Sequence, residues 1–202
     1  MKQAEKEEQI REKMAENSGG LQPWLLCVDN ILLDVAYEMP NNKLWQEVGV
    51  EPGLQYTATN EKLTKAALEV LKLSEGEYGC KLVSRTPGGC ALNAARAANF
   101  YLKSLQELGT DSNICLENRV LNMGCVGADE PAETIIKCHE DEGVLHDLHR
   151  EPTALTGVCA VTIVDSARTC IGILDACEKY PTSHMKRVLS PNSSTLDSLQ
   201  CL

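Results

Sequence analysis

The sequence TPGGCALNAARAANFYLKSLQEL, residues 86–108, contains the pattern that decides the fold. Its proline and paired glycines predict a turn, after which Leu92, Ala95 and Leu105 recur at the spacing of one helical face. The predicted helix, Cys90–Leu108, begins with turns made almost entirely of small residues, and small residues allow a helix to pack closely against a sheet. The stretch therefore favours a helix that covers a sheet.

On the N-terminal side of this helix, the pattern predicts one strand, a broken region and a second helix. Residues 24–33 are an apolar stretch typical of a buried strand, which Asp34 closes. Residues 35–60 are interrupted by prolines, asparagines and glycine, and they predict turns around one or two short strands. Residues 61–73 place apolar side chains on one helical face, with Asn60 as the N-cap.

On the C-terminal side, strand and helix patterns alternate before a hairpin. Val120–Val126 predicts a strand, and a helix follows from Pro131 to about Glu142. Gly157–Val164 and Arg168–Leu174 predict two strands joined by a tight turn. Alternating strands and helices indicate an α/β fold with a parallel sheet, whereas the late hairpin and the broken region indicate a separate small sheet.

The composition restricts the class of protein. The 202 residues carry a net charge of −10 without a basic cluster, whereas nucleic-acid binding depends on clustered Lys and Arg. No apolar run approaches the ~20 residues that span a bilayer. Residues 1–20 are charged and lack the apolar core of a secretory signal. We therefore expect a cytoplasmic protein, with the nucleus also open, that binds neither nucleic acid nor a membrane.

The cysteines and histidines predict no metal site. The ten cysteines are scattered without a CxxC pair, which argues against a zinc ribbon. Several, such as Cys125 and Cys159, lie in apolar runs, and we expect them to be reduced and structural. His139, His146 and His149 lack the HExxH spacing, so we expect surface histidines.

The first candidate binding feature is the entrance to the helix at residue 90. Gly88 and Gly89 would let a ligand approach the backbone, where free helix N–H groups can donate to its oxygens. Asn93, one turn later, offers both a donor and an acceptor. A plain glycine turn with a capping role is the alternative. The motifs GxxxxGK[ST] and GxGxxG are absent, so the sequence has neither a P-loop nor a dinucleotide fingerprint.

Two charged residues are further candidates. Asp34 follows a predicted strand, at the end where open α/β sheets bind ligands, and it could accept two hydrogen bonds from a sugar diol. Its alternative is to cap the next turn. Arg168 lies across the hairpin from Thr156–Ala160 and could hold an anionic phosphate bidentately. A solvated arginine at a turn is the alternative.

Four blocks of the sequence resemble one known family in order and spacing. They are Asp29–Val35, Gly88–Ala98, Gly124–Asp129, and Thr156–Ala160 running on to Arg168. They are similar, respectively, to a GNPLLD first strand, a di-glycine signature with its helix, a GxxGxD strand end and a lid segment TGTCA…R. From about residue 24 to residue 179 the chain therefore resembles the ribokinase (phosphofructokinase-B) family of carbohydrate kinases, and within it the adenosine kinases.

The resemblance implies a fold, a reaction and a set of site residues. The implied fold is α/β, a ribokinase-like three-layer αβα domain with a small β-sheet lid. The implied reaction uses ATP and Mg²⁺ to phosphorylate the ribose 5′-hydroxyl of adenosine, which gives AMP in purine salvage. Carried over by position, Asp34 would bind the ribose 2′ and 3′ hydroxyls, and Arg168 would steady the transferring phosphoryl group. The other substrate-binding residues implied are Asn30, Gln55, Thr57, Gly88, Gly89, Asn93 and Cys159.

The sequence also departs from the family pattern around the expected pocket. Asp29 stands where the family has glycine, and Ile31 where it has proline. Thr57 and Cys170 stand where the family has leucines that contact the base. These departures leave the preferred base or sugar open.

The family's catalytic base is an aspartate in a DTxGAGD motif, and no Gly-Ala-Gly-Asp occurs in the 202 residues. Nothing after Ala176 matches the family. We therefore expect a truncated N-terminal portion that lacks the catalytic aspartate and most of the ATP site and is inactive alone. The alternatives are a non-catalytic short form that binds a nucleoside or a partner, and a fragment of a related sugar kinase.

The expected domain division follows from these assignments. We expect a monomer whose partner is adenosine or a related nucleoside. The predicted parts are a charged tail at 1–21, an incomplete α/β nucleoside-binding domain at 22–37 and 61–143, a small lid sheet at 38–60 and 144–178, and a disordered or foreign tail at 179–202.

Overall fold

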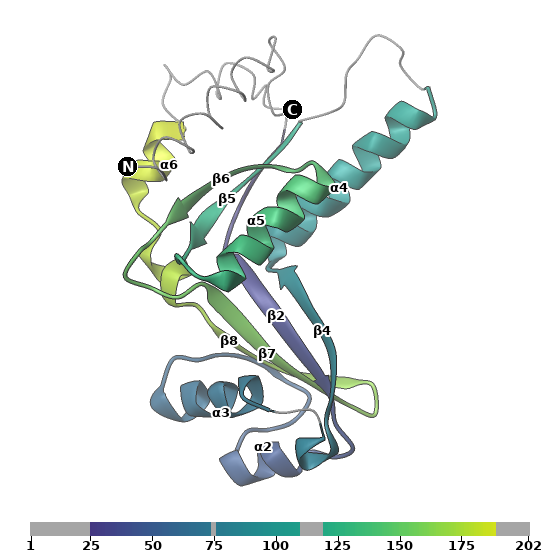
Figure 1. Ribbon diagram of the computed structural model, residues 1–202, viewed down its shortest axis with the longest axis vertical. Coiled ribbons are helices and arrows are strands. Elements are labelled where there is room, and N and C mark those ends of the chain that lie inside the picture. The colour runs from purple at the N-terminus through teal and green to yellow at the C-terminus, as the bar shows by residue number, and fades with distance from the viewer. Residues whose placement is uncertain (1–24, 74–75, 110–118, 189–202) are drawn as a thin grey trace.

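The computed structural model describes residues 25–73, 76–109 and 119–188, which form two sheets (Figure 1). A three-stranded sheet has the order β1-β5-β6, and a five-stranded sheet has the order β3-β8-β7-β2-β4. In Figure 1 the three-stranded sheet lies in the upper half of the molecule and the five-stranded sheet below it. The predicted α/β architecture with a second, separate sheet is confirmed.

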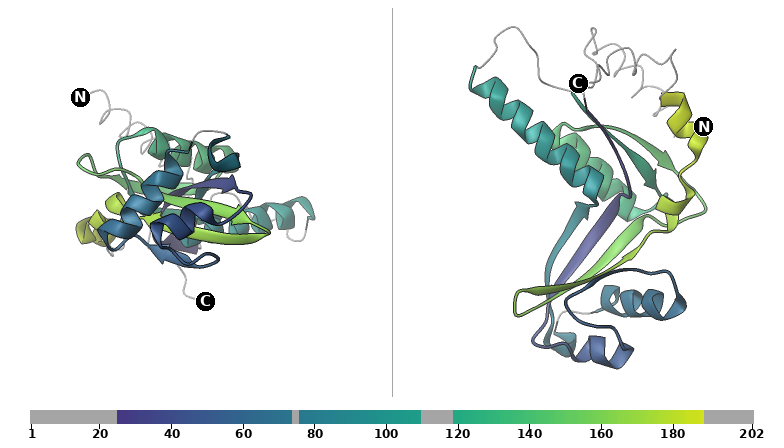
Figure 2. Two further views of the ribbon diagram at one scale, coloured as in Figure 1. Left: turned by 90° about the horizontal axis from the view of Figure 1, so that it is seen from below. Right: turned by 180° about the vertical axis from the view of Figure 1, so that it is seen from behind.

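The three-stranded sheet is parallel and covered on both faces. It contains β1 (Leu25–Val28), β5 (Val120–Val126) and β6 (Leu145–Arg150). Helices α4 (Cys90–Glu107) and α5 (Glu130–Glu142) lie side by side over one face, as Figure 1 and the view from behind in Figure 2 show. The 3₁₀ turn η2 (Asp175–Lys179) and helix α6 (Thr182–Val188) lie on the other face. Every residue of β5 is buried, as expected for a central strand between two layers.

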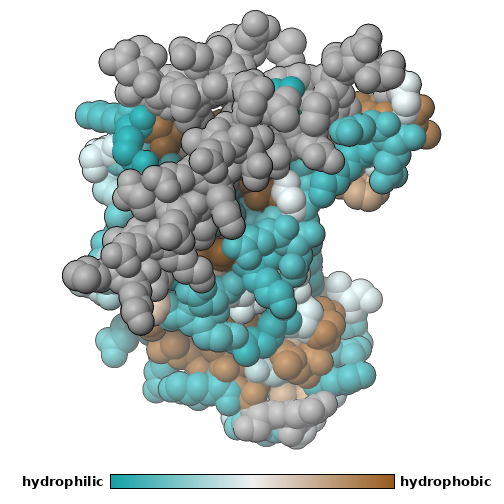
Figure 3. Space-filling view, turned by 45° about the horizontal axis from the view of Figure 1, so that its top comes forward, coloured by the Kyte–Doolittle hydropathy of each residue, from teal (hydrophilic) through white to brown (hydrophobic). Residues whose placement is uncertain are grey.

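The five-stranded sheet is mixed and covered by helices on one face. Its strands are β2 (Leu32–Glu38), β3 (Gln55–Thr57), β4 (Lys81–Gly88), β7 (Gly157–Val164) and β8 (Ala167–Ile173). Helices α2 (Lys43–Val48) and α3 (Glu61–Leu71) pack against alternate strand residues such as Leu33, Val35 and Ala160. In this lower part of the molecule, apolar side chains gather on the face shown in Figure 3.

The centre of that core is Trp45 of α2, which is completely buried. Its indole N–H donates to the hydroxyl of Thr162 on β7, so the polar edge of the ring is satisfied inside the core. The short 3₁₀ turn η1 (Glu77–Gly79) then leads the chain into β4. The residues of β2 and β7 that alternate with this core point to the opposite face of the sheet.

Several predicted elements are confirmed. Helix α3 begins after Asn60, whose side chain accepts a hydrogen bond from Leu63 N at 3.0 Å. Helix α5 begins after Asp129, whose carboxylate accepts one from Ala132 N at 3.2 Å. Strands β5 and β7 have the predicted bounds, and α4 begins at Cys90.

The division into sheets differs from the predicted one. Strands β2 and β4 and helix α3 belong with the five-stranded sheet, although residues 22–37 and 61–143 were assigned to the α/β domain. The expected single strand at 24–33 is divided by a bend at Asp29 into β1 and β2, which enter different sheets. Asp34 does not close the strand as predicted, because β2 continues through it to Glu38.

Two strands were missed for different physical reasons. Thr86, Pro87 and Gly88 end β4 instead of forming the predicted turn, and Pro87 is compatible with a strand because β4 is an edge strand. Strand β6 was assigned to the lid, but it pairs in parallel with β5 across α5. All its residues are half-buried, so its sequence lacks the alternation that identifies a strand.

The predicted tails lie partly outside the described residues. The charged segment 1–21 and residues 189–202 fall outside them. Within 179–188, however, α6 is helical and buries His184 and Val188, so the expectation of disorder is wrong for these residues. Within the three described ranges, no helix has the length and apolarity needed to cross a membrane.

The predicted surface histidines are also corrected. His139 of α5 is completely buried. Its Nδ1 donates to Ile135 O at 2.8 Å, and its Nε2 accepts from Asn122 Nδ2 at 2.9 Å, which fixes a neutral ring. Burial lowers the pKa of His139 to about 4. His146 and His149 are half-buried on β6.

Candidate functional site

A row of residues in register crosses all five strands of the mixed sheet. Thr86 of β4 pairs with Asp34, Asp34 with Cys159, Cys159 with Gly172, and Gly172 with Thr57. Residues opposite one another in neighbouring strands point to the same face. Three of the predicted site residues, from segments far apart in the sequence, therefore share one face of the sheet.

The next row contains a fourth predicted residue. Gln55 of β3 pairs with Cys170, and Cys170 with Val161. Arg168 is two residues before Cys170 on β8, so its side chain leaves the sheet on the same side. We call this surface the Asp34 face: Asp34, Gln55, Thr57, Cys159, Arg168 and Cys170.

The two glycines bring the backbone against the start of this face. A Cβ built on Gly88 would overlap the Asp34 carboxylate, and one built on Gly89 would overlap the Asn30 carbonyl oxygen. Gly89 has a φ of 100°, a conformation that favours glycine, and it is the N-cap of α4. Asn30, Asp34 and the glycine pair therefore meet where α4 begins.

The charged groups of the Asp34 face influence one another. Burial raises the pKa of Asp34, and the Arg168 guanidinium acts in the opposite direction. Asp34 is half-buried, whereas Arg168 is exposed near the tip of the β7–β8 hairpin. A carboxylate and a guanidinium thus face the same space, one at the glycine pair and one near the hairpin tip.

Two cysteines lie between these charges. Cys159 and Cys170 are diagonal neighbours on adjacent strands, with Cys159 opposite Gly172 and Cys170 opposite Val161. The interaction between the two thiols and the Arg168 guanidinium lower the pKa of Cys170, whereas the same interaction and burial raise the pKa of Cys159. Cys159 is buried and Cys170 is half-buried, and all eight cysteines of the described residues are free thiols.

Asn93 is placed differently from the other predicted residues. It is exposed and lines an open groove of about 520 Å³ whose other residues belong to α4 and α5. The groove is also lined by Arg96, Asn99, Phe100, Lys103 and Glu142. The role of Asn93 beside a sugar stays a prediction.

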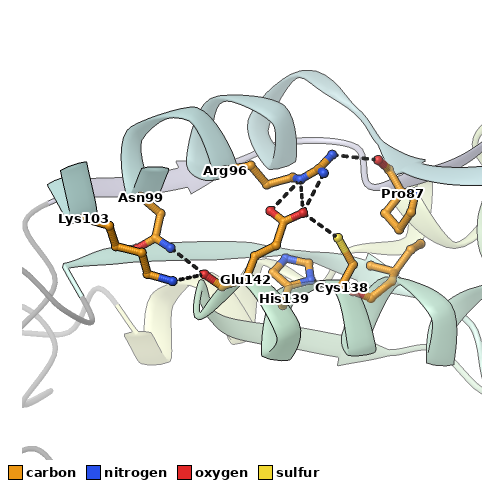
Figure 4. Close-up of polar contacts among 8 residues, drawn as sticks. Pro87, Arg96, Asn99, Lys103, Cys138, His139 and Glu142 are labelled. Carbon is orange, nitrogen blue, oxygen red and sulfur yellow. Dashed lines mark hydrogen bonds and ion pairs between the residues drawn. The ribbon is translucent and has the colours of Figure 1, made fainter. Parts of the chain in front are cut away.

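In this groove, Glu142 joins the two helices. Arg96 donates to both carboxylate oxygens of Glu142, with N–O distances of 2.6 to 2.9 Å. Asn99 Nδ2 donates to the Glu142 carbonyl oxygen at 2.8 Å, and the Lys103 ammonium donates to the same oxygen (Figure 4). The lysine and the asparagine thereby cap the C-terminus of α5.

Asp129 has a structural role that the sequence did not reveal. Its carboxylate accepts hydrogen bonds from Thr156 N at 2.8 Å and from the Thr156 hydroxyl. The same hydroxyl accepts from Gly127 N at 2.9 Å. Asp129 follows β5 and Thr156 precedes β7, so this contact joins the two sheets. The GxxGxD block was the available signal, since it places the acidic residue directly after the strand.

Comparison with known proteins places these features in context. Residues 61–196 match the family model described as pfkB family carbohydrate kinase. The adenosine kinase of Schizophyllum commune is 30% identical over 161 residues, which are 80% of this chain and 40% of that protein. The adenosine kinase of Schizosaccharomyces pombe is 32% identical over 110 residues, which are 53% of this chain and 28% of that protein. The chain thus spans less than half the length of these relatives.

Solved structures agree in fold. The crystal structure of Anopheles gambiae adenosine kinase in complex with P1,P4-di(adenosine-5) tetraphosphate matches with a TM-score of 0.65 at 23% identity, over 82% of this chain and 43% of that chain. Adenosine kinase from Schistosoma mansoni in complex with 2-fluoroadenosine matches with a TM-score of 0.66 at 17% identity, over 87% of this chain and 44% of that chain. At 17–23% sequence identity, these matches show that the chain shares the fold of the two structures.

Proposed function

This chain belongs to the pfkB family of carbohydrate kinases, and on that premise we propose that the Asp34 face is a nucleoside-binding surface of the adenosine-kinase type. The whole reaction proposed is the ATP-dependent phosphorylation of the ribose 5′-hydroxyl of adenosine to AMP, in purine salvage. The residues of this chain supply the nucleoside side of that reaction.

One observation carries the proposal: the register row that runs from Asp34 through Cys159 to Thr57. A carboxylate can accept hydrogen bonds from two neighbouring hydroxyls, as a ribose 2′,3′-diol requires. The glycine pair leaves no side chain between Asp34 and the start of α4, so a sugar can approach the backbone there. Asn30, Gln55, Thr57 and Cys159 then surround the rest of the nucleoside.

Arg168 is proposed to act on the phosphoryl group. It lies on the Asp34 face near the hairpin tip, where a long cationic side chain can reach a group held above the sheet. Its contribution is stabilisation of negative charge that develops during transfer. A guanidinium does not remove a proton at neutral pH, so Arg168 does not replace a general base.

ATP and Mg²⁺ are the proposed co-substrate and metal of the family reaction. Within residues 25–73, 76–109 and 119–188, however, no group of three or more His, Cys, Asp and Glu side chains could hold a metal ion. No catalytic step is therefore assigned to these residues through the metal.

Nucleoside or partner binding without turnover is a second candidate. It is favoured by the Asp34 face, because the residues proposed to bind the nucleoside there need no general base. We expect the purified chain alone to bind adenosine but not to transfer phosphate from ATP. Formation of AMP above a blank reaction would support the first candidate for this chain and exclude the second.

The binding test compares two carboxylates of the same strand. Adenosine should raise the melting temperature of the protein, because a ligand that binds only the folded state stabilises it. Asp34→Asn keeps the side-chain shape and should abolish the shift. Glu38→Gln, at the exposed end of β2, is the control and should keep the shift. An equal shift in all three proteins would exclude Asp34 from the site.

A further inference from the structure

The Asp34 carboxylate points from β2 toward the neighbouring strand β4. A Cβ built on Gly88 of β4 would overlap Asp34 Oδ2 and would lie 3.1 Å from Oδ1, so both oxygens lie beside Gly88. Gly88 is opposite Leu32, and Thr86 is opposite Asp34. These residues therefore share one face of the sheet, and a ligand hydroxyl that reaches the carboxylate lies next to β4.

Four side chains are the neighbours of Asp34 in the strand register of this face. Leu32 and Ala36 flank it along β2. Cys159 is opposite Asp34 on β7, and Thr86 is opposite it on β4. Leu32 and Ala36 are aliphatic, and a thiol is only a weak hydrogen-bond donor. Thr86 is thus the hydroxyl-bearing neighbour, and it lies on the side toward which the carboxylate points.

The spacing between Thr86 and Asp34 leaves room for one ligand hydroxyl. Residues directly opposite one another in antiparallel strands have Cβ atoms about 4.5–5.5 Å apart. An oxygen held above the two side chains can therefore lie at about 2.8 Å from both, the usual distance of an O–H···O hydrogen bond. Thr86 is exposed and β4 is an edge strand, so a ligand can reach this hydroxyl from solvent.

The two side chains have complementary hydrogen-bonding roles. An ionised carboxylate only accepts, so a sugar hydroxyl bound to Asp34 donates its hydrogen and keeps its lone pairs. The Thr86 hydroxyl can donate to one of those lone pairs. Gln55 and Thr57 lie on β3, three strands from β2, which is about 14 Å at the usual strand spacing. They are too distant to contact the same hydroxyl, whereas Thr86 is adjacent to it.

We propose that Thr86 is a substrate-binding residue that selects ribonucleosides. Its hydroxyl donates a hydrogen bond to one hydroxyl of the ribose 2′,3′-diol, the same hydroxyl that donates to Asp34. A nucleoside without this hydroxyl loses both contacts, so the Asp34 face discriminates against that deoxynucleoside more strongly than the carboxylate alone would. The proposal rests on the proposed nucleoside site and adds to it a residue to which the family resemblance gave no role.

The experiment removes the hydroxyl from the protein and from the ligand in turn. Thr86→Val keeps the branched shape and the strand preference of the side chain but lacks the hydroxyl. Calorimetric titration gives the Kd of adenosine, 2′-deoxyadenosine and 3′-deoxyadenosine for each protein. In Thr86→Val the Kd of adenosine should rise about 3–10-fold, as expected for one hydrogen bond. The Kd of the deoxynucleoside that lacks the partner hydroxyl should stay unchanged, and the Kd of the other should rise as for adenosine.

Two further variants separate the hydroxyl from its surroundings. Thr86→Ser keeps the hydroxyl and should bind adenosine with nearly the wild-type Kd. Ser84→Ala removes a hydroxyl from the same strand and face, where it is opposite Ala36 instead of a carboxylate, and should leave all three Kd values unchanged. If Thr86→Val raises none of the three Kd values, or raises all three equally, Thr86 does not bind a ribose hydroxyl.

The wild-type protein distinguishes failure of this proposal from failure of the nucleoside site. If adenosine neither binds nor raises the melting temperature, the proposed function of the Asp34 face fails, and the role of Thr86 fails with it. If adenosine binds and Asp34→Asn abolishes binding, but Thr86→Val leaves every Kd unchanged, only the role of Thr86 fails. Coupling between Thr86→Val and one missing ribose hydroxyl supports both proposals and identifies the hydroxyl that lies between Asp34 and β4.

Discussion

The Asp34 carboxylate occupies the space that a side chain at position 88 would need, because a Cβ built on Gly88 would overlap it. The two residues are on neighbouring strands, with Leu32 of β2 opposite Gly88. Gly88 therefore sets the direction of the carboxylate across the face of the sheet.

Gly88→Ala should displace Asp34. We expect a loss of stability of about 1–3 kcal/mol, typical of an added methyl group in a packed site, and loss of the adenosine-induced melting shift. In an Asp34→Ala background the same substitution should cost much less, because the overlapping group is gone. Urea unfolding of the four proteins measures the coupling. Additive costs would show that the overlap is relieved elsewhere.

Arg168 should control the acid limit of adenosine binding. Asp34 must be ionised to accept two hydroxyl hydrogens, and Arg168 counteracts the burial that raises the pKa of Asp34. Arg168→Gln should therefore raise that pKa further, and binding should be lost at a higher pH as the solution is acidified. Arg85→Gln is the control, since Arg85 of β4 pairs with Glu130 on the surface. If both variants lose adenosine binding at the same pH, Arg168 does not influence the ionisation of Asp34.

His139 should make the fold sensitive to mild acid. Its pKa is lowered to about 4 in the folded protein, against an ordinary value of 6.5, so the unfolded chain binds the proton more strongly. The stability due to the neutral ring is complete above pH 6.5 and is lost as the pH falls toward 4. The expected loss is about 3 kcal/mol over this interval. Urea midpoints between pH 7 and pH 4 should fall less steeply in His139→Gln, and an unchanged slope would contradict this assignment.

Glu142 should stabilise the pairing of α4 with α5. Glu142→Gln keeps the shape of the side chain but removes the charge that Arg96 neutralises, and the expected cost is about 1 kcal/mol after allowance for partial exposure. Glu140→Gln, exposed on the same helix, should have almost no effect. Thermal unfolding of both variants tests the difference. A similar loss in each would indicate a general effect of charge on α5.

Elements with strong local signals could be predicted from the sequence. The N-cap of α3 at Asn60 and the bounds of β5 and β7 depend on neighbouring residues, and each is confirmed. Strand β4 was missed because most of its residues are exposed and its last three resemble a turn. Strand β6 was missed because its side chains are half-buried on both faces.

In the candidate site, too, the residue types could be predicted from the sequence, whereas their alignment could not. The residue types at Asp34, the glycine pair and Arg168 could be selected from local patterns and from the family resemblance. The register that aligns Asp34 with Cys159 and Thr57 depends on pairing between strands more than 100 residues apart in the sequence, and no local pattern contains it.

The Asp129–Thr156 contact also has a mechanical consequence. It joins the residues that follow β5 in one sheet to the residue that precedes β7 in the other. Arg168 lies near the turn of the β7–β8 hairpin, at the end remote from this contact. A change in the angle between the two sheets at the Asp129–Thr156 contact would therefore displace the Arg168 guanidinium more than the Asp34 carboxylate, because Asp34 is paired closer to Thr156 along β7.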